Sequence, residues 1–203
     1  MIALLNYGAG NVRSVHKALT AAGGNVQLVS TPKAVSVSDA VVLPGVGAFD
    51  DCVNAMRQQE LFDATRDFIA TGKPFLGICV GYQALFERSE EFNSREAGLN
   101  VFDGSVVRFP NSERKVPQIG WNKVDILQPN CPILKGIESG SHFYFVHSYY
   151  PQPIDLSITA TRTEYGVSFA SSVWRENIYA TQFHPEKSQK VGLKLLRNFV
   201  DLV

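Results

Sequence analysis

Residues 74–86 read Pro-Phe-Leu-Gly-Ile-Cys-Val-Gly-Tyr-Gln-Ala-Leu-Phe. The first five form an apolar run that predicts a buried strand, and the pattern from Tyr82 predicts the opening of a helix. The same alternation precedes this stretch, with strands predicted over 2–6, 25–29 and 40–43 and helices over 12–22, 49–58 and 61–71. Buried strands that alternate with helices indicate a mostly parallel sheet covered by helices on both faces.

The second half of the chain has a different pattern. Strand-like runs broken by Pro, Gly and Asn occupy 102–109, 123–127, 143–150, 156–163, 168–174 and 178–183, and a final helix is predicted over 188–202. We expect these runs to complete the sheet and to add an antiparallel layer of strands. The sequence therefore predicts one α/β domain over residues 1–203.

Composition excludes several classes of protein. The chain has 203 residues, 19 Lys and Arg against 19 Asp and Glu, and 45% hydrophobic residues. Balanced charge without a basic block argues against a nucleic-acid partner, and no apolar run approaches the ~18 residues of a membrane span. The first residues lack the basic region of a signal peptide. Three cysteines favour a reducing cytoplasm over a disulfide framework, and no Cys/His spacing for zinc is present.

The sharpest local signal is Cys79, which lies between a predicted strand and a predicted helix. Its neighbours Gly77 and Gly81 are small, as a nucleophile on a tight strand-to-helix turn requires. The dipole of the following helix would favour the thiolate, and the N–H of Val80 would be one natural oxyanion donor. The alternative is a buried cysteine between two packing glycines.

A cysteine nucleophile needs a base, and the chain offers four histidines. His16 falls within the first predicted helix, His142 in a turn, and His147 in a strand-like run where a structural role is the default. His184 differs because it opens His184-Pro185-Glu186 at the end of a strand, where Pro185 favours an extended backbone. Glu186 can then hold one ring nitrogen while the other faces the thiol. The alternative is a strand-ending turn with a surface glutamate.

These two motifs resemble those of the class I glutamine amidotransferases, whose catalytic triad is Cys, His and Glu. Gly77–Gly81 and Phe183-His184-Pro185-Glu186 stand in the order and separation of that family. The resemblance implies a flavodoxin-like α/β sandwich and hydrolysis of glutamine through a thioester on Cys79, with no metal and no organic cofactor. It also implies that the turn after the third strand donates the second oxyanion N–H; its candidates are Gly45, Val46 and Gly47.

The resemblance implies further roles for residues that the pattern alone would leave ordinary. Two would hold the charged ends of the substrate, Gln83 and Glu91, although either could be a solvated surface side chain. Three would line the substrate pocket: His147, Ser148 and Tyr149. Four would face a partner subunit, although the two aromatic ones could equally be core residues: Asn11, Trp121, Tyr144 and Lys187.

Longer motifs narrow the resemblance to one kind of member, a separate glutaminase subunit that passes ammonia to a cyclase (synthase) subunit in a heterodimer. They are Asn6–Asn11, Pro44–Phe49, Pro117–Asn122, Phe143–Tyr149 and Gln182–Ser188. Two positions depart from the usual pattern, Tyr82 in the elbow and Gln118. Gly8-Ala-Gly10 resembles half of a dinucleotide fingerprint, but Arg13 replaces the third glycine, so a tight turn is predicted. The alternatives are a glutaminase for pyridoxal phosphate or anthranilate synthesis, a cysteine peptidase-like protein, and a non-catalytic regulatory subunit.

Overall fold

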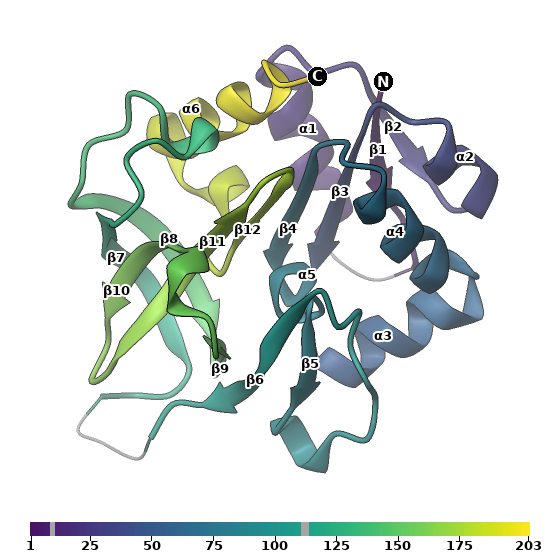
Figure 1. Ribbon diagram of the computed structural model, residues 1–203. Coiled ribbons are helices and arrows are strands. Elements are labelled where there is room, and N and C mark those ends of the chain that lie inside the picture. Colours follow the sequence, from purple (N-terminus) through teal and green to yellow (C-terminus); the bar gives the residue numbers. More distant parts are fainter. Residues whose placement is uncertain (9–10, 111–113) are drawn as a thin grey trace.

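The computed structural model describes residues 1–8, 11–110 and 114–203 (Figure 1). Within these residues the main sheet has nine strands in the order β2-β1-β3-β4-β12-β11-β10-β7-β8. Their bounds are β1 Ile2–Leu5, β2 Val26–Val29, β3 Ala40–Gly45, β4 Phe75–Cys79, β7 Gln118–Ile126, β8 Ser141–His147, β10 Thr159–Glu164, β11 Ser168–Arg175 and β12 Ile178–Thr181. A smaller sheet has the order β5-β6-β9, with β5 Phe86–Ser89, β6 Phe102–Arg108 and β9 Tyr149–Pro153.

The main sheet has a parallel half and an antiparallel half. Strands β2, β1, β3, β4 and β12 pair in parallel, and the pairs from β12 through β11, β10 and β7 to β8 are antiparallel. Figure 1 shows the parallel strands on the right and the antiparallel strands on the left. β12 joins the halves, so the last strand of the chain lies directly beside β4. The predicted mixed architecture is confirmed.

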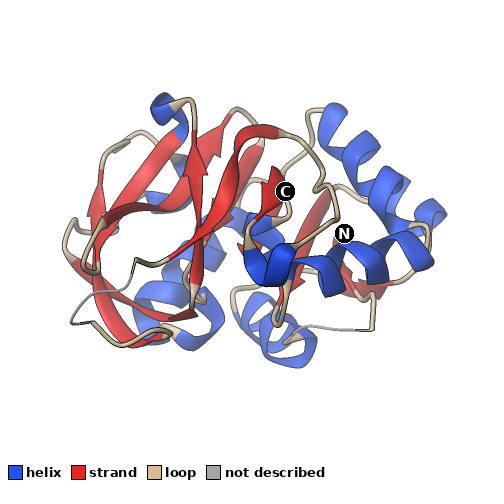
Figure 2. Cartoon of the chain, turned by 90° about the horizontal axis from the view of Figure 1, so that it is seen from below, coloured by secondary structure: helices blue, strands red, loops and turns tan. Residues whose placement is uncertain are grey.

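Helices cover both faces of the parallel half (Figures 1 and 2). α1 Val12–Ala21 contacts α6 Gln189–Val200 on one face, and α3 Phe49–Gln58 contacts α4 Leu61–Ala70 on the other. Between the helices every residue of β1, β3 and β4 is buried. Strands that are covered on both faces must be apolar throughout, and this explains why their sequences lack alternation. A short helix that the pattern did not predict, α2 Pro32–Ser36, begins where the Thr31 side chain accepts a hydrogen bond from the Ala34 N–H.

The helix predicted to open at Tyr82 is wrong in length and position. α5 covers only Val80–Gln83, and the chain then enters β5. Phe86 is fully buried and packs edge-on against Tyr82 and at a tilt against Phe102. Burying a phenylalanine stabilises by roughly 1.5–3 kcal/mol, more than the small helix propensity of one residue. Tertiary packing therefore ends the helix after one turn.

Other boundaries also differ from the sequence pattern. The single strand predicted over 143–150 divides into β8 and β9, which lie in different sheets. Pro151 and Pro153 lack an N–H, so β9 fits at the edge of the small sheet. The strand predicted at 123–127 begins at Gln118, and residues 156–158 form a 3-10 turn, η3 Leu156–Ile158, which the Asp155 side chain caps. The turn expected at Gly8-Ala-Gly10 lies partly outside the described residues.

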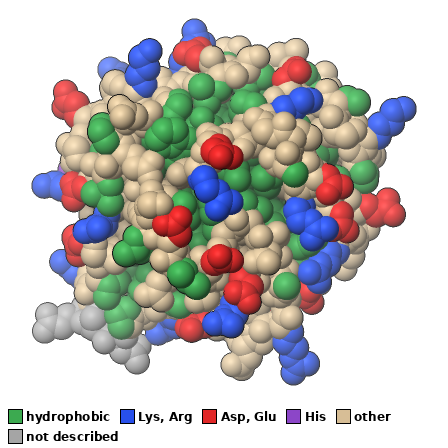
Figure 3. All heavy atoms as spheres, in the orientation of Figure 1, with side chains coloured by type: hydrophobic (Ala, Val, Ile, Leu, Met, Phe, Trp, Pro, Cys, Tyr) green, Lys and Arg blue, Asp and Glu red, His purple; other side chains and the backbone are tan. Residues whose placement is uncertain are grey.

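None of the described helices is long and apolar enough to cross a membrane. On the face shown in Figure 3, acidic and basic side chains are interspersed, and neither sign forms a block.

Candidate active site

Cys79 is the last residue of β4 and has an unusual backbone. Its φ of 55° and ψ of −110° lie outside the regions that a side chain favours. Such strain costs about 1–3 kcal/mol and persists only where the surroundings enforce it. Gly45, at the end of β3, is the register partner of Cys79, so the ends of two adjacent parallel strands meet at the sulfur.

Three glycines enforce this geometry by close approach. A Cβ on Gly81 would overlap the carbonyl oxygen of Leu43, and a Cβ on Gly77 would lie 2.7 Å from the oxygen of Gly81. A Cβ on Gly45 would lie 2.5 Å from the nitrogen of Gly81. The small neighbours predicted around Cys79 are therefore required because β3, β4 and α5 touch through their backbones.

The helix that follows Cys79 is too short to supply the expected dipole. α5 has four residues, which is about one turn, and a macrodipole builds up only over aligned turns. The contribution that remains is local: Val80 is the first residue of α5, and the first N–H groups of a helix have no acceptor within it. Cys79 and Val80 line the same cavity, so the Val80 N–H is a candidate donor there.

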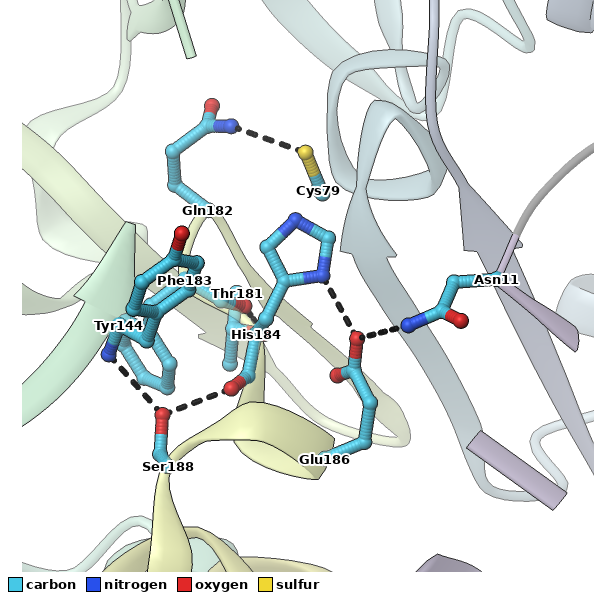
Figure 4. Close-up of polar contacts among 9 residues, drawn as sticks. All are labelled: Asn11, Cys79, Tyr144, Thr181, Gln182, Phe183, His184, Glu186 and Ser188. Carbon is cyan, nitrogen blue, oxygen red and sulfur yellow. Dashed lines mark hydrogen bonds and ion pairs between the residues drawn. The ribbon is translucent and has the colours of Figure 1, made fainter. Parts of the chain in front are cut away.

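His184 follows β12, and the structure brings it to Cys79 across the β4–β12 pair. Its Nδ1 lies 2.7 Å from Oε1 of Glu186, and both side chains are buried, with exposed fractions of 1% and 0%. Figure 4 shows the other ring nitrogen turned toward the Cys79 sulfur. That nitrogen, Nε2, has no hydrogen-bond partner among the described residues. The backbone continues from His184 into a 3-10 turn, η4 Pro185–Lys187, so the turn rather than a fully extended segment aims Glu186 at the ring.

The charges around His184 favour its protonated form. Burial alone lowers the pKa of His184, but the Cys79 sulfur and the Glu186 carboxylate together raise that pKa to about 10. The arrangement thus favours the imidazolium form of His184. An imidazolium beside a thiolate is the resting state that a cysteine nucleophile needs.

Two residues that the pattern did not assign to the triad hold it in place. Asn11 donates from Nδ2 to Oε1 of Glu186 at 3.1 Å. The Ser188 hydroxyl donates to the His184 carbonyl at 2.7 Å and accepts the Tyr144 N–H at 3.0 Å. These bonds tie the His184 turn to the loop before α1 and to β8 (Figure 4).

The predicted oxyanion turn lies opposite Cys79. Val46 and Gly47 line the cavity beside the sulfur, and Gly47 has a φ of +93°. Gly45 is buried beneath them against α5, so its place is structural. The buried Tyr7 hydroxyl donates to the Pro44 carbonyl at 2.6 Å and anchors the strand end that leads into this turn. No sequence motif around Tyr7 predicts this anchor.

A cavity of about 290 Å³ opens at Cys79. The structure brings all the predicted substrate residues to its wall: Gln83, Glu91, His147, Ser148 and Tyr149. Glu91 is half-buried; burial raises its pKa, and its Oε2 accepts the Phe49 N–H at 2.7 Å. Among the described residues, no group of three or more His, Cys, Asp or Glu side chains is placed to hold a metal ion.

Gln83 is buried, which corrects the view of it as a helix-surface residue. Its Nε2 donates to the Tyr149 carbonyl at 3.0 Å and to Oε1 of Gln182 at 3.2 Å. Both N–H bonds of the amide are thus used, and Oε1 is the atom left for a ligand. A carbonyl oxygen suits an ammonium group.

His147 is held neutral. Burial lowers its pKa to about 4, and Nδ1 lies 2.8 Å from the Tyr149 carbonyl, which can only accept. Nδ1 therefore carries the proton and Nε2 accepts. Oε1 of Gln118 lies 2.9 Å from Nε2. Turning the Gln118 amide over places its NH₂ group at this position, where it donates to the neutral ring, so the departure at this position leaves the ring satisfied. The other departure, Tyr82, is fully buried, and its hydroxyl donates to the Ala170 carbonyl at 3.3 Å.

The residues predicted to face a partner lie in two places. Trp121 and Tyr144 are register partners on β7 and β8, with ring centroids 6.1 Å apart, and the Lys187 ammonium lies 5.7 Å from the centre of the Tyr144 ring. Trp121 is 46% exposed, so it is not a core residue, and Ile119 on the same strand is 63% exposed. Asn11 lies apart from this group, at Glu186.

Gln182 is the main residue at the site that sequence reasoning left without a role. Its Nε2 lies 3.7 Å from the Cys79 sulfur, and its side chain is fully buried (Figure 4). The signal was its position two residues before His184, because side chains at i and i+2 of an extended segment share a face.

Comparisons with known proteins show which family the chain belongs to. The family model of glutamine amidotransferase class-I matches residues 3–202. The imidazole glycerol phosphate synthase subunit HisH of Syntrophotalea carbinolica is 47% identical, with all of both chains covered. The subunit of that name from Herpetosiphon aurantiacus is 48% identical over 100% of this chain and 94% of its own. The solved structure of PurLQS from Thermotoga maritima has a TM-score of 0.75 at 18% identity, with 98% of this chain and 97% of that chain covered, and so supports the fold. The chain belongs to the class I glutamine amidotransferase family, as the family model over residues 3–202 and the 47% identity over both full chains show.

Proposed function

We propose that the chain is the glutaminase subunit of an imidazole glycerol phosphate synthase of histidine biosynthesis. The observation that carries the proposal is the buried line from Cys79 through His184 to Glu186, set at the wall of a cavity of about 290 Å³. The 47% identity to the Syntrophotalea carbinolica subunit, over the whole of both chains, supports this member of the family. We expect the chain to act as one domain in the cytoplasm.

The reaction begins when the Cys79 thiolate attacks the side-chain amide carbon of glutamine. The carbonyl oxygen becomes an oxyanion, which the N–H of Val80 and an N–H of the Val46–Gly47 turn stabilise; each donor contributes about 10²–10³ in rate. His184 gives its proton to the amide nitrogen, the C–N bond breaks, and ammonia leaves a thioester on Cys79. Water then adds to the thioester while His184 takes its proton, and the S–C bond breaks to release glutamate. Glu186 keeps the Nδ1 proton of His184 in place throughout.

Recognition of free glutamine rests on its charged ends. The Glu91 carboxylate and the Gln83 carbonyl oxygen are acceptors on the cavity wall, which suits the α-ammonium group. Ser148 and Tyr149 form the neighbouring wall, and their backbone would face the α-carboxylate end. No metal or organic cofactor takes part in this scheme.

Ammonia released into water would be protonated, so the scheme needs a partner that consumes it. We propose a cyclase subunit, which docks on the exposed aromatic surface of Trp121, Tyr144 and Lys187 beside the His184 turn. Ile119 extends this surface. Because uncoupled turnover wastes glutamine, we expect weak glutaminase activity from the chain alone.

The experiment measures glutamate released from glutamine by the purified chain, alone and with a cyclase subunit and its ribonucleotide substrate. Strong stimulation supports both the chemistry and the partner. High activity without a partner would refute the proposal that glutaminase activity depends on the cyclase subunit. No activity under either condition would favour a peptidase-like or regulatory protein.

A matched pair of variants tests the nucleophile. Cys79→Ala is expected to abolish glutamate release, whereas Cys131→Ser, a change of another buried cysteine, leaves it within about twofold. Equal losses in both variants would refute Cys79 as the nucleophile. Trp121→Ala tests the docking surface and is expected to reduce the stimulation while it leaves the basal rate unchanged.

A further inference from the structure

Gln182 lies behind the nucleophile, on a side of the cysteine that the triad does not use. It precedes the Phe183–His184 segment, its side chain is 0% exposed, and its Nε2 lies 3.7 Å from the Cys79 sulfur. Figure 4 shows its amide nitrogen directed at the sulfur, while His184 approaches from another direction. The mechanism above leaves this amide without a role, although a buried side chain that reaches a reacting atom is costly to place by chance.

The hydrogen bonds fix which end of the Gln182 amide faces the sulfur. The Tyr149 carbonyl can only accept, so the end of Gln83 that lies 3.0 Å from it is the NH₂ group. The same NH₂ group lies 3.2 Å from Gln182, so the facing atom of Gln182 is its oxygen. The other end of Gln182, at Cys79, is therefore its NH₂ group. A flipped Gln182 would set two NH₂ groups against each other.

We infer that Gln182 is a further functional residue: its amide donates an N–H to the Cys79 sulfur and stabilises the thiolate from the side that His184 does not occupy. A thiolate accepts such a bond far better than a thiol does, because a hydrogen bond to a charged group is roughly twice as strong as a neutral one. Gln83 affects this bond indirectly. It donates to the Gln182 oxygen and so keeps the Gln182 NH₂ group directed at the sulfur. The inference deepens the proposed function, but the donor's effect on the thiolate does not require glutamine as the substrate.

Other groups near the sulfur also affect its charge, and the variants leave them in place. The imidazolium of His184 favours the thiolate; the nearby neutral or acidic groups are His147, Glu91, Tyr7 and Cys52, and Lys187 is the other cation on the cavity wall. The Gln182 bond is long, so we expect a contribution at the low end for a bond to a charged group. That corresponds to about a tenfold change in the thiolate-to-thiol ratio.

The test is the pH dependence of Cys79 alkylation by iodoacetamide, with the modified cysteine identified by mass spectrometry. Gln182→Met removes the donor and keeps the length of the side chain. Gln182→Glu keeps the shape and the contact with Gln83 but adds a negative charge at the sulfur. In Gln182→Met we expect the pH midpoint of Cys79 alkylation to rise by about one unit, so that alkylation slows about tenfold at pH values below the wild-type midpoint. Gln182→Glu is expected to shift the midpoint further in the same direction.

Two controls separate this role from structural damage. Gln152→Met, on β9, makes the same change away from the sulfur and is expected to leave the midpoint unchanged. Gln83→Met keeps Gln182 but frees its orientation, and we expect a smaller upward shift. An unchanged midpoint in Gln182→Met or Gln182→Glu chains that retain the native unfolding transition would overturn the inference. A shifted midpoint in the variant, together with a wild-type chain that releases no glutamate alone or with the cyclase subunit, would instead keep the inference and refute the proposed function.

Discussion

Replacement of Glu186 by glutamine tests how the triad keeps its histidine in the correct tautomer. Oε1 of Glu186 accepts from Nδ1 of His184 at 2.7 Å and from Nδ2 of Asn11 at 3.1 Å. Oε2 is buried and has no partner among the described residues. A glutamine at this position has one oxygen and one NH₂ group to place at these two sites. Because Asn11 presents its NH₂ group there, the oxygen of the substituted amide stays at Asn11 and His184 and accepts from both.

The expected loss is therefore small for a triad residue. The hydrogen bond to Nδ1 survives, and only its charge is removed. Hydrogen bonds to charged groups contribute about 1.5–3 kcal/mol and neutral ones about 0.5–1.5, so the change costs about 1–1.5 kcal/mol, or about tenfold in rate. When the amide that replaces the acid of a triad leaves the histidine in the wrong tautomer, kcat falls about 10⁴-fold instead.

Combining Glu186→Gln with Asn11→Ala removes the hydrogen bond that keeps the amide oxygen facing His184. Asn11→Ala alone leaves a symmetric carboxylate, so the tautomer is unchanged and we expect a loss of about two- to fivefold. In Asn11→Ala combined with Glu186→Gln the amide is free to turn its NH₂ group toward Nδ1. The proton of the ring then moves to Nε2, and we expect a further loss of about 10²–10³.

The assay is kcat/KM for glutamate release by the four chains of this cycle, with urea unfolding of each to confirm the native fold. Losses that multiply independently would refute the role of Asn11 as the group that orients Glu186. So would a loss near 10⁴ in Glu186→Gln alone.

Three further outcomes follow from the geometry. Gly81→Ala would overlap the Leu43 carbonyl and is expected to destabilise the fold by several kcal/mol; a native urea midpoint would contradict the interlocked elbow. Tyr7→Phe removes the donor to the Pro44 carbonyl, and we expect about 1–2 kcal/mol lower stability with slower glutamate release; unchanged kinetics would show that the oxyanion turn needs no anchor. The folded-state pKa of His147 is about 4, below the 6.5 of an unfolded histidine. The neutral ring's contribution to the free energy of unfolding is therefore fully present above pH 6.5 and is lost as the pH falls toward 4. Urea unfolding should show the wild type losing about 3 kcal/mol more than His147→Gln over this window, and parallel pH profiles would contradict the buried neutral ring.

The parallel half of the fold and the proximity of His184 and Glu186 to Cys79 could be predicted because their causes are local. Continuous apolar runs reveal strands that are covered on both faces, and the glycines beside Cys79 follow from the tightness of the turn. His184 and Glu186 share a short motif whose spacing already brings them together. In each case the chemistry needs only neighbours in the sequence.

The parts that could not be predicted depend on contacts between distant segments. Whether α5 continues beyond Gln83 depends on the packing of Phe86 with Phe102, and not on helix propensity. Tyr7 reaches the Pro44 carbonyl, and Gln182 reaches Cys79, only because of the order and register of β1, β3, β4 and β12. Nothing in the immediate sequence of Tyr7 or Gln182 marks its partner.

The place of β12 between β4 and β11 also sets the moment at which the protein becomes reactive. Cys79 and Gln182 are 103 positions apart in the chain, a stretch that a ribosome adds in about 5–20 seconds. During that interval the thiol has been synthesised, but neither its amide donor nor its base exists. On the proposed mechanism, the nascent chain therefore carries an ordinary cysteine until the strand that precedes His184 pairs with β4.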